Sequence, residues 1–125
     1  MSAIPDLIRL LDWLPLPAFV QSREGTLRHV NAAMRSLTGV SIDNYLGRSV
    51  AEILPKAAVH RLAEEDRLVF AGEMVTSETT FQLAGGVHVK LFVSKRRAEH
   101  PQWGEVLVGV GQDFTQWRAW SETKP

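Results

Sequence analysis

Residues 79–94 read TTFQLAGGVHVKLFVS, and this stretch decides the fold class. Apolar and polar residues alternate on both sides of Gly85 and Gly86, most regularly at 87–94. In a strand, every second side chain lies on the same face, so alternation with a period of two indicates a strand. A glycine pair favours a turn. The stretch therefore predicts an antiparallel hairpin with one half-buried face.

The residues that follow predict a third strand and a closing helix. At 105–112 three valines, among them Val108, share one face of a strand, and two glycines in it indicate a bend or the close approach of another backbone. Helical character returns at 113–120, where Asp113 or Thr115 can cap the first turn.

Upstream of the hairpin, residues 56–71 are mostly helix formers and Gly72 supplies a stop. Asp66 interrupts the apolar stripe of this helix, and we expect it at the margin of the buried face, with a buried polar role as the alternative. Since Glu64, Glu65 and Asp66 are neighbours that splay around the axis, we expect a solvent-exposed acidic face there and no shared active site.

The first third of the chain predicts a helix followed by a hairpin. Apolar residues recur at spacings of three and four within 1–13, which is typical of an amphipathic helix. Strands are expected at 18–22 and 27–30, with Glu24 and Gly25 in the turn between them.

Asn31 stands where the N-cap of a helix at 32–37 belongs, and Gly39 closes that helix. Two very short helices are expected after Ser41 and Ser49. The order of elements predicts an α+β fold: one five-stranded antiparallel sheet with helices on one face, flanked by N-terminal and C-terminal helices.

The length, the net charge and the absence of long apolar stretches limit the possible classes of function. A length of 125 residues suits one domain, and fourteen basic against fourteen acidic residues give no field that gathers polyanions. The basic run at Lys95, Arg96 and Arg97 is expected at the solvated end of a hairpin strand, so we expect no nucleic-acid partner. Neither a signal peptide nor an apolar stretch of about 18 residues is present, which predicts a cytoplasmic domain without a membrane segment.

Two stretches resemble the PAS family of sensory domains in order and spacing. LPLPAFV at 14–20, followed by Gly25 and by VNAA at 30–33, resembles the first hairpin and first helix of that family. LTGVS at 37–41 with LGRS at 46–49 resembles its connector of short helices.

A third stretch, Asp113, Phe114 and Thr115, is similar to the Asp-aliphatic-Thr signature that precedes a downstream helix in many PAS domains, with phenylalanine in the aliphatic place. The resemblance covers about residues 14–118. It divides the chain into an N-terminal dimer or cap helix at 1–13, a PAS sensory domain at 14–113 and the start of a C-terminal signalling helix at 114–125.

The resemblance implies a sheet curved around a pocket, homodimerisation through the flanking helices, and signal transduction to an attached kinase, cyclase or transcription factor, as in two-component systems. The residues expected to relay the signal are Asp113, Phe114 and Thr115. The residues expected at the dimer contact, if nothing else covers the first helix, are Leu7, Ile8, Leu11 and Trp117.

A ligand pocket would draw on the apolar residues of the helices and strands. The alternative is that these side chains simply fill the core, because packed interiors leave little void. The candidate pocket residues are Met34, Leu37, Ile53, Val59, His60, Leu62, Phe70, Phe81, Leu91 and Val108.

Cofactor chemistry is limited by the absence of cysteine, which removes a cysteinyl-flavin adduct, a coumarate chromophore and thiolate metal sites. Haem held by His60 and non-covalent flavin stay open as alternatives, because imidazole is a suitable iron ligand. The other histidines are scattered and predict no metal site.

The expected function is a sensory domain that binds a small molecule or mediates dimerisation, and not an enzyme, because no nucleophile with a base or pair of converging carboxylates is evident. Two alternatives remain. One is a ligand-free PAS-like dimerisation scaffold, and the other is a small cone-shaped α+β binding protein or enzyme.

Overall fold

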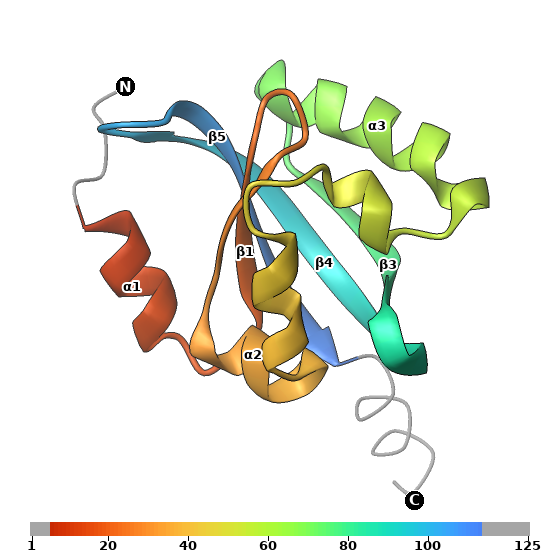
Figure 1. The fold of residues 1–125 in the computed structure, drawn as a ribbon. Coiled ribbons are helices and arrows are strands. Elements are labelled where there is room, and N and C mark those ends of the chain that lie inside the picture. The colour runs from red at the N-terminus through yellow and green to blue at the C-terminus, as the bar shows by residue number, and fades with distance from the viewer. Residues whose placement is uncertain (1–5, 114–125) are drawn as a thin grey trace, which may run out of the picture.

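The computed structural model describes residues 6–113, which form one antiparallel sheet with helices on both of its faces (Figure 1). The strand order β2-β1-β5-β4-β3 joins the first hairpin to the three later strands and places β5 at the centre. The predicted α+β fold is confirmed. The strands are β1 (Ala18–Ser22), β2 (Leu27–Val30), β3 (Val75–Leu83), β4 (Val87–His100) and β5 (Gly104–Asp113).

The helical elements follow the predicted order. The short 3₁₀ segments fill the predicted connector, and another 3₁₀ turn joins β3 to β4. The elements are α1 (Leu7–Trp13), α2 (Ala32–Thr38), η1 (Val40–Tyr45), η2 (Val50–Ile53), α3 (Lys56–Phe70) and η3 (Ala84–Gly86).

Asn31 is the N-cap of α2, as predicted, since its Oδ1 accepts a hydrogen bond from the Met34 N–H at 2.9 Å. The same oxygen accepts from the Ala18 N–H at 2.9 Å, and Nδ2 donates to the carbonyl oxygens of Leu11 at 2.7 Å and Leu16 at 2.8 Å. One fully buried side chain thus fixes the end of α1, the start of β1 and the start of α2 relative to one another.

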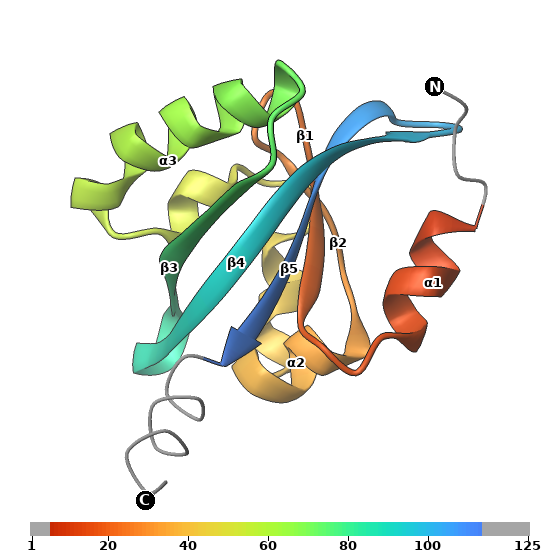
Figure 2. The ribbon, with the colours of Figure 1, turned by 180° about the vertical axis from the view of Figure 1, so that it is seen from behind.

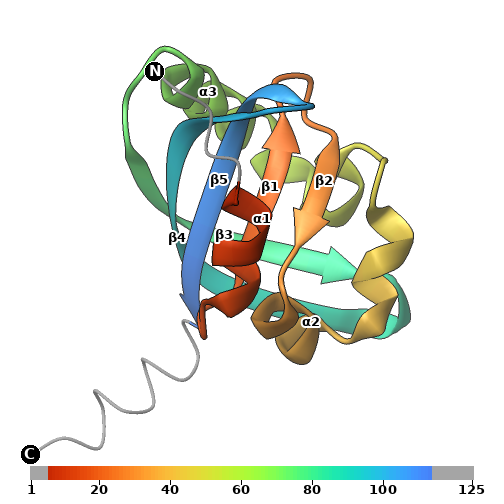
Figure 3. The same ribbon diagram turned by 90° about the vertical axis from the view of Figure 1, so that its left-hand side faces the viewer.

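The concave face of the sheet carries the main core. α2, η1, η2 and α3 lie over this face, as the side view shows (Figure 3). Phe19 of β1 packs edge-on against Phe81 of β3, with the ring centroids 5.7 Å apart. The fully buried side chains of the helical elements include Met34, Ile42, Ile53 and Val69.

The opposite, outer face is covered by α1 only over part of the sheet. Leu7 and Leu11 are buried there with Ala18, Val20 and Val106 in a second cluster. Seen from behind, α1 lies at one side, and no helix within residues 6–113 stands in front of β3 and β4 (Figure 2). The outer face of the sheet therefore stays partly open to solvent, with Phe92 about half exposed.

The burial of Leu7 and Leu11 corrects their prediction as dimer contacts. The outer faces of β1 and β5 are apolar, so α1 covers them within the same chain. Ile8 packs at the margin of the same cluster. Trp117 lies outside the described residues.

β3 and β4 are longer than predicted, because both continue into polar sequence. β4 runs to His100 and pairs along β5 as far as Gly104. The run Lys95, Arg96 and Arg97 is therefore inside a strand, and its expected place at a solvated hairpin end is wrong for Lys95, which is buried. No helix within residues 6–113 has the length and apolar character needed to cross a membrane.

Candidate functional site

A buried lysine lies at the centre of the concave face. Lys95 continues the inward series of β4 that includes Val89, Leu91 and Val93, and it is 4% exposed. Its ammonium group contacts Oδ1 of Asp66 at 3.1 Å and Oε1 of Glu65 at 3.7 Å, both on α3. A buried ammonium needs such partners, because removing a charge from water is costly unless it is paired.

Asp66 connects two strands to α3. Its Oδ1 accepts from Lys95 of β4, and its Oδ2 accepts a hydrogen bond from Nε2 of Gln21 of β1 at 2.8 Å. Strands β1 and β4 are the two neighbours of β5 in the sheet. The Asp66 carboxylate of α3 therefore links the two strands that lie on either side of the central strand β5.

The neighbouring Glu65 connects α3 to the edge strand. Its carboxylate accepts from the Ser77 hydroxyl of β3 at 2.6 Å and pairs with Arg61 of α3 at 2.7 Å. The expected solvent-exposed acidic face is thus wrong for Glu65, because Lys95 attracts its carboxylate toward the sheet. Asp66 is partly buried, which agrees with the margin of the buried face expected for it. Glu64 is exposed as expected and pairs with Arg67.

A small internal cavity of about 10 Å³ adjoins the linked side chains of Gln21, Asp66 and Lys95. The hydroxyl of Thr79, which is 3% exposed, has no hydrogen-bond partner among residues 6–113. A cavity of this size holds roughly one water molecule. The lining residues are Phe19, Gln21, Val50, Leu54, Leu62, Asp66, Thr79, Phe81 and Lys95.

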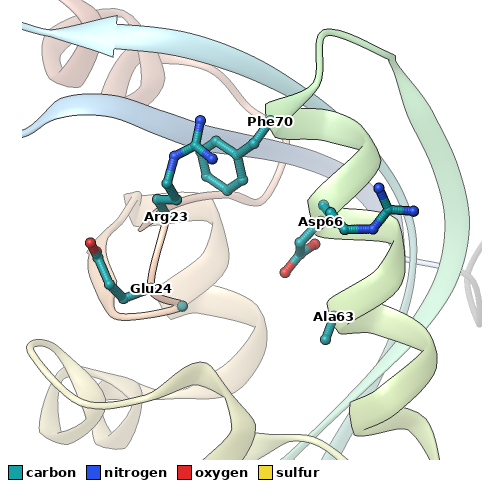
Figure 4. A pocket seen from close by; sticks show the side chains of 7 residues that line it. Arg23, Glu24, Ala63, Asp66 and Phe70 are labelled. Atoms are coloured by element: carbon teal, nitrogen blue, oxygen red, sulfur yellow. The ribbon is translucent and has the colours of Figure 1, made fainter.

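A larger groove of about 250 Å³ opens at the surface between the β1–β2 turn and α3 (Figure 4). Asp66 points from α3 into the space that faces the turn, and the Arg23 guanidinium lies across the Phe70 ring, 5.0 Å from its centroid. Asp66 lines both this groove and the internal cavity, so its side chain stands between solvent and the buried lysine. The groove is completed by Glu24, Gly25, Ala63 and Arg67.

The rim of the groove carries charges of both signs. Arg23 pairs with Glu105 of β5, and Arg67 pairs with Glu64 within α3. A hydrogen bond with its own backbone N–H, together with one from the Ser22 hydroxyl, lowers the pKa of the Glu24 carboxyl below its ordinary value. Arg23 and Arg28 add to this lowering through their positive charges.

The predicted pocket residues lie in several different environments. Leu62 and Phe81 line the internal cavity. His60 is exposed on α3, and Val108 packs in the cluster under α1 on the outer face. Phe70 belongs to the main core and also lines the groove. Met34, Ile53 and Leu91 lie in the main core, Leu37 packs against it, and Val59 is partly buried on α3.

The pocket prediction for Val108 is wrong because a period of two identifies a shared face without saying which side of the sheet it is. The predicted sharing of a face by Val106, Val108 and Val110 agrees with their common cluster. Of the predicted relay residues, Asp113 ends β5. Phe114 and Thr115 lie outside the described residues.

The polar residues Gln21, Asp66, Thr79 and Lys95 were not predicted as site residues. Two of them carried a signal that could have identified them. Lys95 keeps the inward parity of the alternation in β4, and Asp66 interrupts the apolar stripe of α3. A charge of each sign at an inward position indicates a buried pair.

The single curved sheet, the helices across its concave face and the polar cavity between them define a small α+β domain. The family model described as "PAS fold" matches residues 11–119. The chain belongs to the PAS family, whose members are sensory signalling domains.

Solved structures of PAS domains have the same fold. The PAS domain of an HTR-like protein from Haloarcula marismortui is 18% identical, with a TM-score of 0.71 over 86% of this chain and 88% of that one. A domain of a sensory box sensor histidine kinase/response regulator from Geobacter sulfurreducens is 20% identical, with a TM-score of 0.68 over 85% and 90% of the two chains.

The Drosophila melanogaster Cycle PAS-B domain, solved with bound ethylene glycol, is 18% identical, with a TM-score of 0.68 over 79% of this chain and all of that one. At these identities the likeness extends to the fold. No curated protein sequence matches the chain.

Proposed function

We propose that this PAS domain is a ligand-responsive sensor. In this proposal a small molecule enters the groove between the β1–β2 turn and α3, acts on Asp66, and changes the position of β5. The ethylene glycol bound to the Drosophila Cycle PAS-B domain supports the idea that this fold admits small molecules.

One observation carries the proposal: Asp66 lines the groove and is also hydrogen-bonded to both strands that flank β5. A ligand that moves this carboxylate alters the contacts of β1 and β4 together. Packed interfaces change between discrete arrangements instead of deforming smoothly, so a small shift at α3 is passed on to the central strand.

The proposed signal leaves the domain at the end of β5. This strand ends at Asp113 and is followed in the chain by residues 114–125. We propose that the change in β5 is passed through this segment to an effector such as a kinase, a cyclase or a transcription factor, with Asp113, Phe114 and Thr115 as the relay.

Replacing Asp66 with asparagine is expected to loosen β5. The amide of the new side chain keeps the shape of the carboxylate but loses the charge that pairs with Lys95, so the link between α3 and the flanking strands weakens. We expect amide hydrogen exchange in β5 to rise by about tenfold, read residue by residue by NMR.

Glu64→Gln is the matched control, since Glu64 lies two residues away on the same helix and pairs only with exposed Arg67 among the contacts within residues 6–113. This variant is expected to leave exchange in β5 unchanged. If Asp66→Asn alters exchange only within α3, or if both variants act alike on β5, the proposed route is wrong.

A second candidate function, dimerisation, is favoured by the open part of the outer sheet face. There a groove of about 310 Å³ is lined by Leu16, Phe92, Val110 and neighbouring polar residues. Leu10 and Trp13 of α1 are exposed nearby in sequence, at 50% and 77%. We propose that a second copy of the chain covers this face, so that the dimer contact uses Phe92 and Leu16 instead of Leu7 and Leu11.

Phe92→Glu is expected to weaken self-association by at least about tenfold, because it places a charge in the centre of an apolar contact. Sedimentation equilibrium measures the change. Met74→Glu is the control, since Met74 is 65% exposed but does not line this groove. Equal dissociation constants for the wild type and Phe92→Glu would exclude this face as the dimer contact.

A further inference from the structure

We propose that Lys95, Gln21 and Thr79 form a binding site for the carboxylate of a small organic acid, and that Asp66 occupies this site when the acid is absent. The inference rests on the proposed sensor function and gives its ligand a chemical class. In the ligand-free domain, the Asp66 carboxylate then takes the place of the ligand carboxylate.

The side chains that converge on the cavity provide the donors that a carboxylate needs. The Lys95 ammonium has three N–H donors and no acceptor, and the Gln21 amide supplies two more. The Thr79 hydroxyl is buried, lines the same cavity and has no partner among residues 6–113. An ionised carboxylate has acceptors only, so it satisfies this set without leaving an unpaired group of its own.

Asp66 already displays the recognition geometry. Lys95 donates to one of its oxygens at 3.1 Å and Gln21 donates to the other at 2.8 Å, so each oxygen of the carboxylate has its own donor. A ligand carboxylate in the same place keeps the buried ammonium paired, with Glu65 3.7 Å away as in the present arrangement. The exchange therefore avoids leaving Lys95 without a counter-charge, which is the costly step.

The groove gives the acid its route to this site. Asp66 separates the groove from the cavity, and turning its side chain toward the groove exposes the three donors behind it. At the rim, the guanidinium groups of Arg23 and Arg67, which pair with Glu105 and Glu64 in the ligand-free domain, provide donors for an anion. Phe70 and Ala63 offer apolar contact to its carbon skeleton. Glu24 opposes a second negative charge, so the site favours a monocarboxylate, and a groove of about 250 Å³ limits its size.

The test is chemical rescue of Asp66→Ala. This substitution removes the carboxylate and leaves a space of the size of formate beside Lys95. Thermal unfolding is measured in sodium formate and in sodium chloride at the same pH and ionic strength. We expect a saturable rise in Tm in formate, about 3–6 °C above chloride at ten times the dissociation constant. Acetate is expected to give a smaller rise, because its methyl group meets the Cβ of the introduced alanine.

Two further variants make the result specific. Asp66→Ala combined with Lys95→Met is expected to lose the formate effect, because the ammonium is gone. Glu64→Ala, on the exposed side of α3, is expected to show no difference between the two salts. Should Asp66→Ala stay unfolded in both salts, Asp66→Ser is measured in the same way.

Equal Tm values in formate and chloride for both Asp66→Ala and Asp66→Ser overturn the proposal, and so does a formate effect that survives Lys95→Met. These results concern recognition alone. If formate rescue occurs while hydrogen exchange in β5 is unaffected by Asp66→Asn, the carboxylate site stands and the proposed signalling route fails.

Discussion

Asn31→Ala is expected to lower the free energy of unfolding by about 3–5 kcal/mol, the largest effect of any single substitution considered for this domain. The side chain is 0% exposed, and it makes hydrogen bonds with Ala18, Met34, Leu11 and Leu16. Alanine leaves two N–H groups and two carbonyl groups in the interior without these partners. Urea unfolding followed by tryptophan fluorescence measures the loss.

The control is Ser49→Ala, which removes the side-chain cap of η2. Ser49 is exposed, and its hydroxyl accepts one bond, from the Ala51 N–H at 3.2 Å. We expect a loss of about 0.5–1 kcal/mol, the lower part of the range for a capping residue. A similar loss for both variants would mean that Asn31 acts as a cap alone and does not join α1, β1 and α2.

Gly109→Ala is expected to cost about 2–3 kcal/mol, because the added Cβ overlaps the ring of Phe19 directly across the sheet. Phe19 has little room to move, since its ring is buried and packs on Phe81. Gly111→Ala is the comparison, because a Cβ there would meet Leu91 atoms at 3.3 Å, and we expect a change of at most about 1 kcal/mol.

A double-mutant cycle tests the cause assigned to the Gly109 effect. Phe19→Leu removes the ring that the new Cβ meets, so the double variant Phe19→Leu/Gly109→Ala is expected to be more stable than the sum of the single losses predicts, by about 1–2 kcal/mol. Strict additivity would show that the cost of Gly109→Ala has another source, such as the pairing of β5 with β1.

A buried lysine that pairs with two partly buried carboxylates is unusual in a small domain. Replacing a buried ion pair by apolar side chains is often neutral or stabilising, so the contacts of Lys95 with Asp66 and Glu65 give little reason to expect added stability. Their value lies in the position of Asp66 between the groove and the flanking strands of β5. This position is what the sensor proposal uses.

Several features of the fold could be predicted because they depend on neighbours in sequence. The hairpin of β3 and β4 follows from alternation around a glycine turn, and Asn31 precedes a helical run. The other three hydrogen bonds of Asn31 could not be foreseen, because Ala18, Leu11 and Leu16 are brought to it by the packing of α1 and β1.

The candidate site was predicted less well than the fold, because apolar residues were selected as pocket residues. Most of those residues fill the core, as the alternative interpretation held, while the cavity is bordered by Gln21, Asp66, Thr79 and Lys95. Lys95 was expected at a solvated strand end, because charged side chains are usually exposed. The burial of Gln21 and Lys95 depends on their pairing with Asp66, which brings α3 together with β1 and β4.

Local sequence patterns specify the types and order of the elements and the parity of each strand, because propensity, periodicity and turn chemistry act between residues that are close along the chain. The same patterns carry the family resemblance. Packing between distant segments decides which face of each strand is covered. It buries Leu7 and Leu11 of α1 against the sheet, and it brings Lys95 to Asp66, 29 positions away in the sequence. Such contacts depend on how the sheet and helices pack, which local patterns do not specify.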